Sequence, residues 1–376
     1  MKSIKGEKNE KTLSILCVIS LFFTLFACVS SESDKLESPI YTGEKLSGTL
    51  RICNLGEYIS VGIDRETVDI IKLFEEETGI DVIYTTVDNN ESMYAKLTSG
   101  TVNYDVIITS DYMIERLIAE NHLASFDAAS LSNYGNIADR FKNLEYDPTN
   151  SYSAPYFWGT VGIIYNTKYV TAEEAKSWNV LWDQKYRGKV LMYDNPRDAF
   201  AVAQKLLGYS INTTDETEIR ASADKLKKGN FIYVADQIFA KIPAENAYLG
   251  VCYAGDYLTM LADNEDLAFS IPAEGTNVFT DAMCITAKSS CKELAQFFIN
   301  YMLDAQIGKI NAEYVGYATP NTASMALLDE SITSNTAIYP DNVDEMVANK
   351  NWERMFHLPT ATIRLMSELL TEVRSK

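Results

Sequence analysis

Two aspartates that could do chemistry stand four residues apart, directly after a strand-like segment. Asp194 and Asp198 follow the apolar run 190–193, and a pair of carboxylates is the catalytic equipment of most glycosidases. No nucleophile–base constellation accompanies them, and the only histidines, His122 and His357, are isolated in the sequence. Without a histidine pair or a Cys-x-x-Cys motif, a zinc site and a histidine-based catalytic triad are also disfavoured. The acidic residues therefore indicate ligands for a cation, and the sequence predicts no catalytic residue, no metal site and no cofactor.

The segments that must position these residues alternate between strand and helix patterns. In the first half of the chain, strands are expected at 50–54, 81–87 and 105–109, and helices at 65–78, 91–98 and 112–120. This alternation predicts an α/β fold with a largely parallel sheet. Ligands of such sheets bind beyond the carboxyl ends of the strands. Residues 110–112 follow one expected strand and residues 194–198 follow another, so both segments lie where a ligand of such a sheet would bind.

The second half of the chain predicts another lobe of the same kind. The expected strands are 160–165, 189–193, 248–253 and 282–285, and the expected helices are 198–207, 215–228, 292–303 and the C-terminal segment from 342 onward. About 330 residues follow position 46. One hydrophobic core rarely covers so many residues, so two lobes are expected.

The first 27 residues have the composition of a secretory signal peptide. Four lysines precede an apolar run at 13–27, which is short for a spanning helix of ~20 residues. The junction Leu25-Phe26-Ala27-Cys28 resembles the lipobox of bacterial lipoproteins, which implies a diacylglycerol on Cys28 and cleavage just before it. An uncleaved membrane anchor is the alternative. Residues 28–46 are rich in serine and charge, and they predict a flexible tether.

The charge balance is strongly acidic. The whole chain has a formal net charge of −19, with 33 basic and 52 acidic residues. Removing residues 1–27 removes four lysines and two glutamates, which leaves 29 basic and 50 acidic residues and a net charge of −21. Nucleic-acid binding requires a basic surface and is therefore not expected. An acidic protein suits a cationic ligand.

The cysteines after Cys28 do not form a metal-binding pattern. Cys53, Cys252 and Cys284 each lie in apolar, strand-like sequence, where a thiol behaves as a small buried hydrophobe. A disulfide between Cys284 and Cys291 is conceivable in an exported protein. The sequence does not decide whether it forms.

Nine ordered motifs resemble the spermidine/putrescine-binding proteins that serve bacterial polyamine ABC importers. They are NLGEY at 54–58, NNESMYAKL at 89–97, YDVIITSDY at 104–112, PYFWG at 155–159, SWNVLW at 177–182 with YRG at 186–188, DNPRD at 194–198, LGYS at 207–210, GYATPN at 316–321 and YPD at 339–341. The resemblance covers about 48–360 of the chain.

The resemblance implies a fold, a partner and a location. The fold class is α/β, the two-lobed periplasmic-binding-protein type II fold, with hinge strands crossing between lobes near 156–160 and 276–282 and the ligand in the cleft. The first lobe is expected to comprise 47–157 and 280–325, and the second 158–279 and 326–376. The protein is expected to be a monomer that delivers a polyamine to the transmembrane subunits of an ABC permease. Its expected location is the periplasmic space or the outer face of the cytoplasmic membrane, with Cys28 as its anchor.

A polyamine sets clear chemical requirements. Each ammonium needs a carboxylate to replace its water, and each methylene segment favours aromatic faces that also attract cations. The resemblance implies these ligand-binding residues: Glu57, Tyr58, Ser110, Tyr112, Asp198, Tyr253, Phe279, Asp281, Tyr317 and Glu353. Asp281 is the carboxylate expected to hold an amine, and Asp111 and Asp256 are interpreted as turn or capping residues.

Some positions depart from the family pattern. Leu55 replaces an aromatic residue, Asn195 stands where some members have Asp, and Tyr253 and Phe279 are smaller than the usual Trp. These differences leave the length of the ligand open. A receptor of the same fold for an amino acid, a sugar or ferric ion is one alternative, and a ligand sensor is another.

Overall fold

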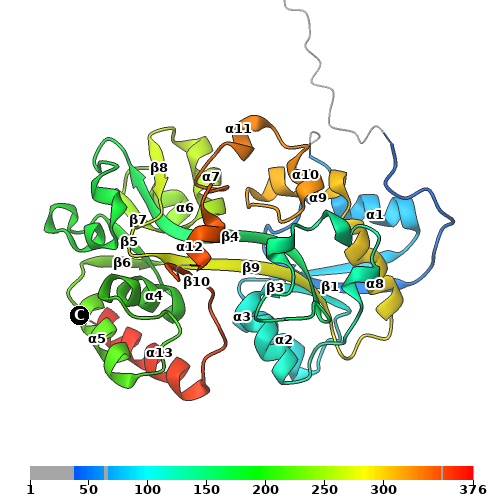
Figure 1. Cartoon of the computed structure of the whole chain (residues 1–376), viewed down its shortest axis with the longest axis horizontal. Helices are drawn as coiled ribbons and strands as arrows, with labels where there is room; N and C mark the ends of the chain where they lie inside the picture. Colours follow the sequence, from blue (N-terminus) through cyan, green and yellow to red (C-terminus); the bar gives the residue numbers. More distant parts are fainter. Residues whose placement is uncertain (1–37, 63–66, 349, 376) are drawn as a thin grey trace, which may run out of the picture.

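The computed structural model describes residues 38–62, 67–348 and 350–375. The expected signal peptide and residues 28–37 of the expected tether, Cys28 included, lie outside these residues. The rest of the expected tether is not free: Ile40, Tyr41 and Leu46 pack against the first lobe, and the backbone N–H groups of Ile40 and Tyr41 donate to Glu77. The described chain forms two α/β lobes that share one ten-stranded sheet (Figure 1). Its strands are β1 (Thr49–Leu55), β2 (Asp81–Val87), β3 (Val106–Ser110), β4 (Ser153–Asn166), β5 (Val190–Tyr193), β6 (Phe231–Val234), β7 (Leu249–Tyr253), β8 (Leu267–Ser270), β9 (Thr276–Ile285) and β10 (Trp352–Glu353).

Helices cover the sheet in both lobes (Figure 1). The α-helices are α1 (Ile70–Thr78), α2 (Asn90–Ser99), α3 (Asp111–Ala119), α4 (Pro196–Leu207), α5 (Glu216–Leu226), α6 (Ile238–Lys241), α7 (Ala254–Asp263), α8 (Lys292–Met302), α9 (Ala305–Val315), α10 (Thr322–Met325), α11 (Glu330–Thr333), α12 (Val343–Ala348) and α13 (Thr360–Arg374). Single turns of 3-10 helix form at Ala128–Ser130, Tyr134–Asn136, Asp139–Phe141, Glu174–Lys176 and Gln184–Tyr186, and a longer one forms at Trp178–Trp182.

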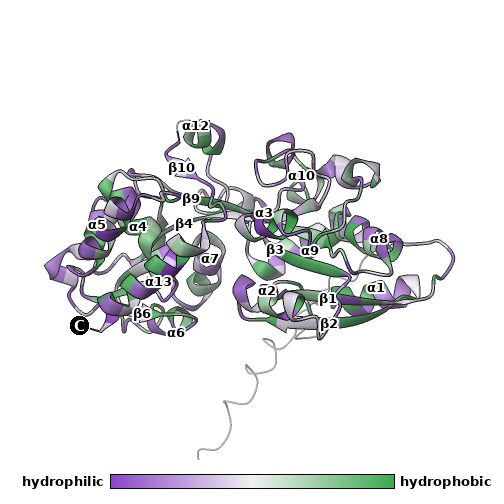
Figure 2. Ribbon diagram, turned by 90° about the horizontal axis from the view of Figure 1, so that it is seen from below, coloured by the Kyte–Doolittle hydropathy of each residue, from purple (hydrophilic) through white to green (hydrophobic). Residues whose placement is uncertain are grey.

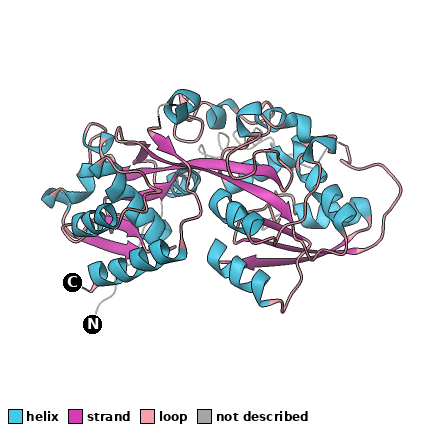
Figure 3. Cartoon of the chain, turned by 60° about the horizontal axis from the view of Figure 1, so that its bottom comes forward, coloured by secondary structure: helices cyan, strands magenta, loops and turns pink. Residues whose placement is uncertain are grey.

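Two long strands join the lobes. The path of paired strands is β2-β1-β3-β9-β4-β7-β5-β6. Residues 153–160 of β4 pair antiparallel with 278–284 of β9, and both strands continue into each lobe, as Figure 3 shows. β9 pairs with β3 of the first lobe, and β4 pairs with β7 of the second. The expected crossings near 156–160 and 276–282 are therefore confirmed.

The two long strands were predicted only in part. The sequence predicts strands at 160–165 and 282–285, whereas β4 and β9 extend over 14 and 10 residues. Every residue of both strands is buried, because neighbouring strands flank each of them in the sheet and their side chains pack within the apolar cores. A strand buried on both faces lacks the alternation that marks a half-exposed strand.

Local capping explains where the helices of the site begin and end. Asn195 lies before α4, and its side chain accepts a hydrogen bond from the backbone N–H of Arg197. Pro196 occupies the first turn, where its missing N–H has no consequence, and Gly208 ends the helix with φ of 77°. Asn195 therefore serves as the N-cap of the helix that carries Asp198.

Each lobe has its own apolar core. Ile52, Phe74 and Phe298 are fully buried in the first, and Met192 and Phe200 are fully buried in the second. Figure 2 shows hydrophilic segments mainly on the outer helices and loops.

The C-terminal part of the chain packs against both lobes. α13 packs in the second core through Met366 and Leu370. Leu328 and Tyr339, by contrast, pack in the first core, because the chain after Gly316 returns along α9. The exact lobe boundaries stay a prediction, and this packing favours a boundary later than 326.

The cysteines of the described chain are free thiols. Cys53, Cys252 and Cys284 are buried as predicted, and Cys291 is partly exposed and does not pair with Cys284. No helix among the described residues is long and apolar enough to cross a membrane.

Candidate functional site

The candidate site lies where strands of both lobes end. β1 and β3 run parallel in the first lobe, and β5 and β7 run parallel in the second. Tyr58 follows β1, Ser110 ends β3, Asp198 follows β5, and Tyr253 ends β7. Carboxyl ends of parallel strands are the usual ligand-binding edge of an open α/β sheet. The hinge strand β9 adds Asp281 and Phe279 beside them.

Asp281 is the most confined carboxylate of this group. It lies opposite Ser110 in the β3–β9 register, and only 4% of its surface is exposed. The Tyr58 hydroxyl donates a hydrogen bond of 2.5 Å to Oδ2 of Asp281, whereas Oδ1 is buried with no hydrogen-bond partner among the described residues. Burial raises the pKa of Asp281, and the hydrogen bond from Tyr58 and the nearby hydroxyl of Ser110 oppose that rise. A buried carboxylate with one free oxygen is a strong acceptor for a cation.

Asp198 supplies a second carboxylate from the first turn of α4. It is 5% exposed, and the hydroxyl of Tyr253 donates a hydrogen bond of 2.8 Å to it. Burial raises the pKa of Asp198 to about 6, while the bond from Tyr253 and the nearby charge of Arg197 act in the opposite direction.

Asp256 supplies a third carboxylate. From the sequence, this residue is predicted to be a turn or capping residue. It does lie in the first turn of α7. Its carboxylate, however, accepts hydrogen bonds from the hydroxyls of Tyr317, at 2.7 Å, and Tyr193, at 3.2 Å. Burial raises its pKa to about 6 against the effect of these two bonds. The sequence alone does not predict that Asp256 accepts hydrogen bonds from these tyrosines, because they lie 61 and 63 residues away in the chain.

Aromatic rings connect the three carboxylates. The rings of Tyr58 and Tyr317 meet edge to face at 5.5 Å, and those of Tyr253 and Phe279 do so at the same distance. Phe279 also lies 6.1 Å from Tyr317, and Tyr193 lies 5.0 Å from Tyr253. We call this set the aromatic–carboxylate cluster: Tyr58, Tyr193, Asp198, Tyr253, Asp256, Phe279, Asp281 and Tyr317.

Two glycines leave the space that the rings of Tyr317 and Phe279 occupy. A Cβ at Gly255 would lie 2.0 Å from the ring of Tyr317, and one at Gly159 would lie 2.8 Å from the ring of Phe279. Gly159 belongs to the PYFWG motif. Any larger residue at these positions would displace a ring of the cluster.

Among the other predicted residues, Tyr112 lies near the cluster, since burial and the charges of Glu91 and Asp198 raise its pKa. The hydroxyl of Tyr112 donates to Glu91 at 2.9 Å. Glu57 is exposed in the loop after β1, with a left-handed φ of 54°. Glu353 on β10 forms an ion pair of 2.6 Å with Lys205, whose side chain is 7% exposed. The ion pair already compensates the charge of Glu353, so a role for this residue in ligand binding stays a prediction.

Asp111 contacts the backbone of β9 next to Asp281. It is 1% exposed and accepts hydrogen bonds from the backbone N–H groups of Tyr112 and Thr280. Burial raises its pKa to about 7, opposed by the guanidinium of Arg354 and reinforced by the charge of Asp281. The N-cap of α3 is Ser110, and Asp111 joins the first turn of α3 to the hinge strand β9 through Thr280. The interpretation of Asp111 as a capping residue is therefore wrong.

A metal centre finds no support in the described chain. Within 38–62, 67–348 and 350–375 there is no group of three or more His, Cys, Asp or Glu side chains that could hold an ion.

Comparison with known proteins identifies the family. The family model of the bacterial extracellular solute-binding proteins matches residues 102–342. The chain belongs to this family. It is 33% identical over 311 residues to the spermidine/putrescine-binding periplasmic protein of Escherichia coli strain K12, an alignment that covers 82% of this chain and 87% of that protein.

Solved structures agree with the family assignment. A putative spermidine/putrescine ABC transporter protein from Listeria monocytogenes is 38% identical, with a TM-score of 0.78 and coverage of 87% of this chain and 98% of that one. The substrate-binding protein PotD of Streptococcus pneumoniae is 35% identical, with a TM-score of 0.75 and coverage of 87% and 99%. The predicted two-lobed, type II periplasmic-binding-protein fold is confirmed, and so is the predicted family resemblance.

Proposed function

We propose that this protein is an extracytoplasmic receptor that binds a linear polyamine, putrescine or spermidine, and delivers it to an ABC importer. One observation carries the proposal: Oδ1 of Asp281 is buried without a hydrogen-bond partner among the described residues. A carboxylate in this state needs a cation, and a primary ammonium supplies both the charge and the hydrogen-bond donor. The names of the relatives in Escherichia coli and Streptococcus pneumoniae support this choice of cation.

The arrangement of the cluster suits a cation with an apolar spacer. Asp281 lies on the hinge strand β9, and Asp256 lies on α7 of the second lobe. Tyr58 contacts Asp281, Tyr317 contacts Asp256, and the rings of these two tyrosines contact each other. The ring of Phe279 lies next to that of Tyr317. Aromatic faces bind methylene groups and attract neighbouring ammonium groups. A single metal ion would make no use of the aromatic faces, and a sugar would leave Asp281 without a cationic partner.

The proposed ligand residues combine the predicted set with two additions from the structure. They are Glu57, Tyr58, Ser110, Tyr112, Asp198, Tyr253, Phe279, Asp281, Tyr317 and Glu353, together with Tyr193 and Asp256. In the proposed mechanism, β4 and β9 act as the hinge, and closure of the lobes around the ligand creates the surface that the permease recognises. The protein itself carries out no chemical reaction.

Calorimetry of the chain without residues 1–28 tests the proposal. Putrescine, spermidine, cadaverine and spermine are titrated in turn, and we expect one polyamine to bind per monomer with release of heat. Amino acids, sugars and ferric ion serve as comparison ligands. Heat or a melting shift with one of these alone, and none with any polyamine, would show that the receptor has another ligand.

We also propose that the exported protein is held on the membrane by a lipid on Cys28. The basic start, the short apolar run and the Ala27-Cys28 junction support this. Any tether ends before Ile40, because Ile40, Tyr41 and Leu46 pack against the first lobe. Stable anchoring by acyl chains generally takes more than one chain, which a diacylglycerol provides.

Cys28→Ser is expected to release the protein from the membrane fraction or to leave it uncut. Membrane fractionation with mass determination of the intact protein distinguishes the two results. Cys291→Ser is the matched control, because Cys291 is a free, partly exposed thiol far along the chain. A Cys28→Ser protein that stays on the membrane at the parent's mass would exclude the lipid anchor.

A further inference from the structure

The loop that carries Tyr58 into the cluster has a demanding backbone conformation. Glu57 has a φ of 54°, a left-handed value that costs a non-glycine residue roughly 1 kcal/mol. Such a loop keeps one shape only if its surroundings hold it. The question is which residues hold it, since the Tyr58 hydroxyl must reach Asp281.

Buried side chains hold this loop at two backbone positions. The carbonyl oxygen of Tyr58 accepts hydrogen bonds from the hydroxyl of Tyr156 at 2.7 Å and from the side-chain amide of Asn54 at 3.1 Å. Two residues later, the backbone N–H of Ser60 donates to the side-chain oxygen of Asn311 at 3.0 Å.

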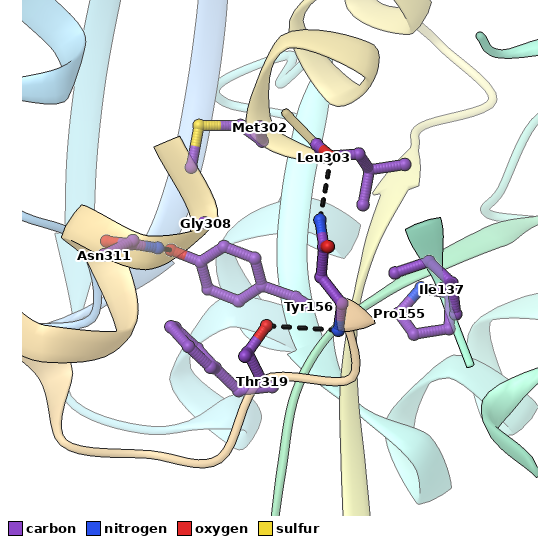
Figure 4. Close-up of a pocket in the computed structure, with 10 residues that line it drawn as sticks. Ile137, Pro155, Tyr156, Met302, Leu303, Gly308, Asn311 and Thr319 are labelled. Carbon is purple, nitrogen blue, oxygen red and sulfur yellow. Dashed lines mark hydrogen bonds between the residues drawn. The ribbon is translucent and has the colours of Figure 1, made fainter. Parts of the chain in front are cut away.

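Tyr156 and Asn311 form one connected unit. The amide nitrogen of Asn311 donates to the hydroxyl oxygen of Tyr156 at 2.5 Å, a bond drawn in Figure 4. Asn311 is 1% exposed and Tyr156 is 6% exposed. Because both ends of the Asn311 amide are used, its orientation is set. The Tyr156 ring also contacts the Tyr58 ring edge to face at 5.7 Å.

The unit ties separate elements together. Tyr156 lies on the hinge strand β4, Asn311 on α9, and Asn54 on β1. In Figure 4 the Tyr156 ring lies between Asn311 and the hinge strand, on the wall of a small pocket that Thr319 and Gly308 also line. Movement of any one element would therefore change the position of the Tyr58 loop.

We propose that Tyr156 and Asn311 are positioning residues of the ligand site, which hold Tyr58 in place to share Asp281 with a ligand ammonium. The inference rests on the proposed function and deepens it. Neither side chain needs to touch the ligand. Without these two side chains, the loop would have to become ordered when the ligand binds. The cost of that ordering would make the binding free energy less favourable.

A double-mutant cycle with calorimetry tests this role. Tyr156→Phe keeps the ring and removes only the hydroxyl, and it is expected to weaken polyamine affinity by about three- to tenfold, the range of one buried hydrogen bond. In a Tyr58→Phe background the same change is expected to weaken affinity by less than about twofold, since the loop no longer delivers a hydroxyl to Asp281.

Tyr134→Phe is the matched control. Tyr134 is buried in the same core, and its hydroxyl has no hydrogen-bond partner among the described residues, so affinity is expected to stay at the parent's level. Asn311→Ala is a second test of the same role. It is also expected to weaken polyamine affinity, and by less in the Tyr58→Phe background than in the parent.

The outcomes separate the two levels of the argument. A parent protein that binds no polyamine contradicts the proposed function itself. A parent that binds, with Tyr156→Phe and Asn311→Ala equal to it in affinity, overturns the positioning role alone. Losses of equal size in the presence and absence of the Tyr58 hydroxyl would also overturn it, because they would show a general structural effect.

Discussion

Asp281→Asn is expected to weaken polyamine binding by about 30-fold to several thousand-fold, the equivalent of ~2–5 kcal/mol. The change keeps the shape of the side chain and its acceptor oxygen for the Tyr58 hydroxyl, but it removes the negative charge. The ligand ammonium would then be buried beside a neutral group. Because the buried charge of Asp281 has no cationic partner of its own among the described residues, the ligand-free protein should not lose stability.

Glu57→Gln is the control for Asp281→Asn. Glu57 also lies beside Tyr58, but it is exposed, and exposed ion pairs contribute only ~0–1 kcal/mol. Its loss of affinity should therefore be fivefold or less, by the same conversion of about 1.4 kcal/mol per tenfold. Calorimetry of both variants at one salt concentration makes the comparison. If Asp281→Asn binds within about threefold of the parent, Asp281 is not an amine ligand.

Polyamine affinity is expected to fall about 100-fold between about pH 7.5 and about pH 5. The reason is that Asp198 and Asp256 both have pKa values raised to about 6, and a cation binds only their charged forms. Each carboxylate then contributes about tenfold over this range. The ammonium groups of the ligand stay charged throughout. Calorimetry across this range measures the slope, and Asp256→Asn should flatten it by the share of one group.

The stability of the ligand-free protein should follow the opposite trend. A carboxylate whose pKa is higher in the folded state binds more protons there than in the unfolded chain between the two pKa values. Stability therefore rises as the pH falls from above the folded pKa toward the unfolded value. For Asp198, Asp256 and Asp111, that window runs from about 7 down to the ordinary value of 3.8.

Thermal unfolding without ligand checks this second trend. We expect a higher unfolding temperature near about pH 5 than near about pH 7.5, with a smaller difference in Asp198→Asn and Asp256→Asn. Affinity that is independent of pH over the same range would contradict the assignment of these carboxylates to the ligand. Opposite trends in stability and affinity would be hard to explain by partial unfolding.

The sequence by itself determined the local elements and the class of the protein. The strand at 81–87 has the predicted bounds, and the helices after β1, β3 and β5 lie within a few residues of prediction. Gly79 and Gly208 end their helices with left-handed φ values of 79° and 77°, conformations that glycine adopts without strain. These features depend on neighbouring residues, so periodicity and capping residues are sufficient to find them.

Most carboxylates and rings of the site could also be named from the sequence, because the family resemblance implies them, although Asp281 and Phe279 lie outside the quoted motifs. Asp281, Tyr58, Asp198 and Tyr253 are in contact as pairs in the structure. The order of the motifs along the chain indicates the family, and the family implies the residues of the site. The motifs do not show which carboxylate contacts which tyrosine.

Only the tertiary structure decided the pairing and the charge state of these groups. Tyr58 and Asp281 are 223 residues apart, and Tyr156 and Asn311 are 155 residues apart, so no local pattern could join them. The role of Asp256 and the compensation of Glu353 by Lys205 likewise depend on distant partners. Burial sets the raised pKa values, and burial is a property of the packed lobes rather than of any short segment.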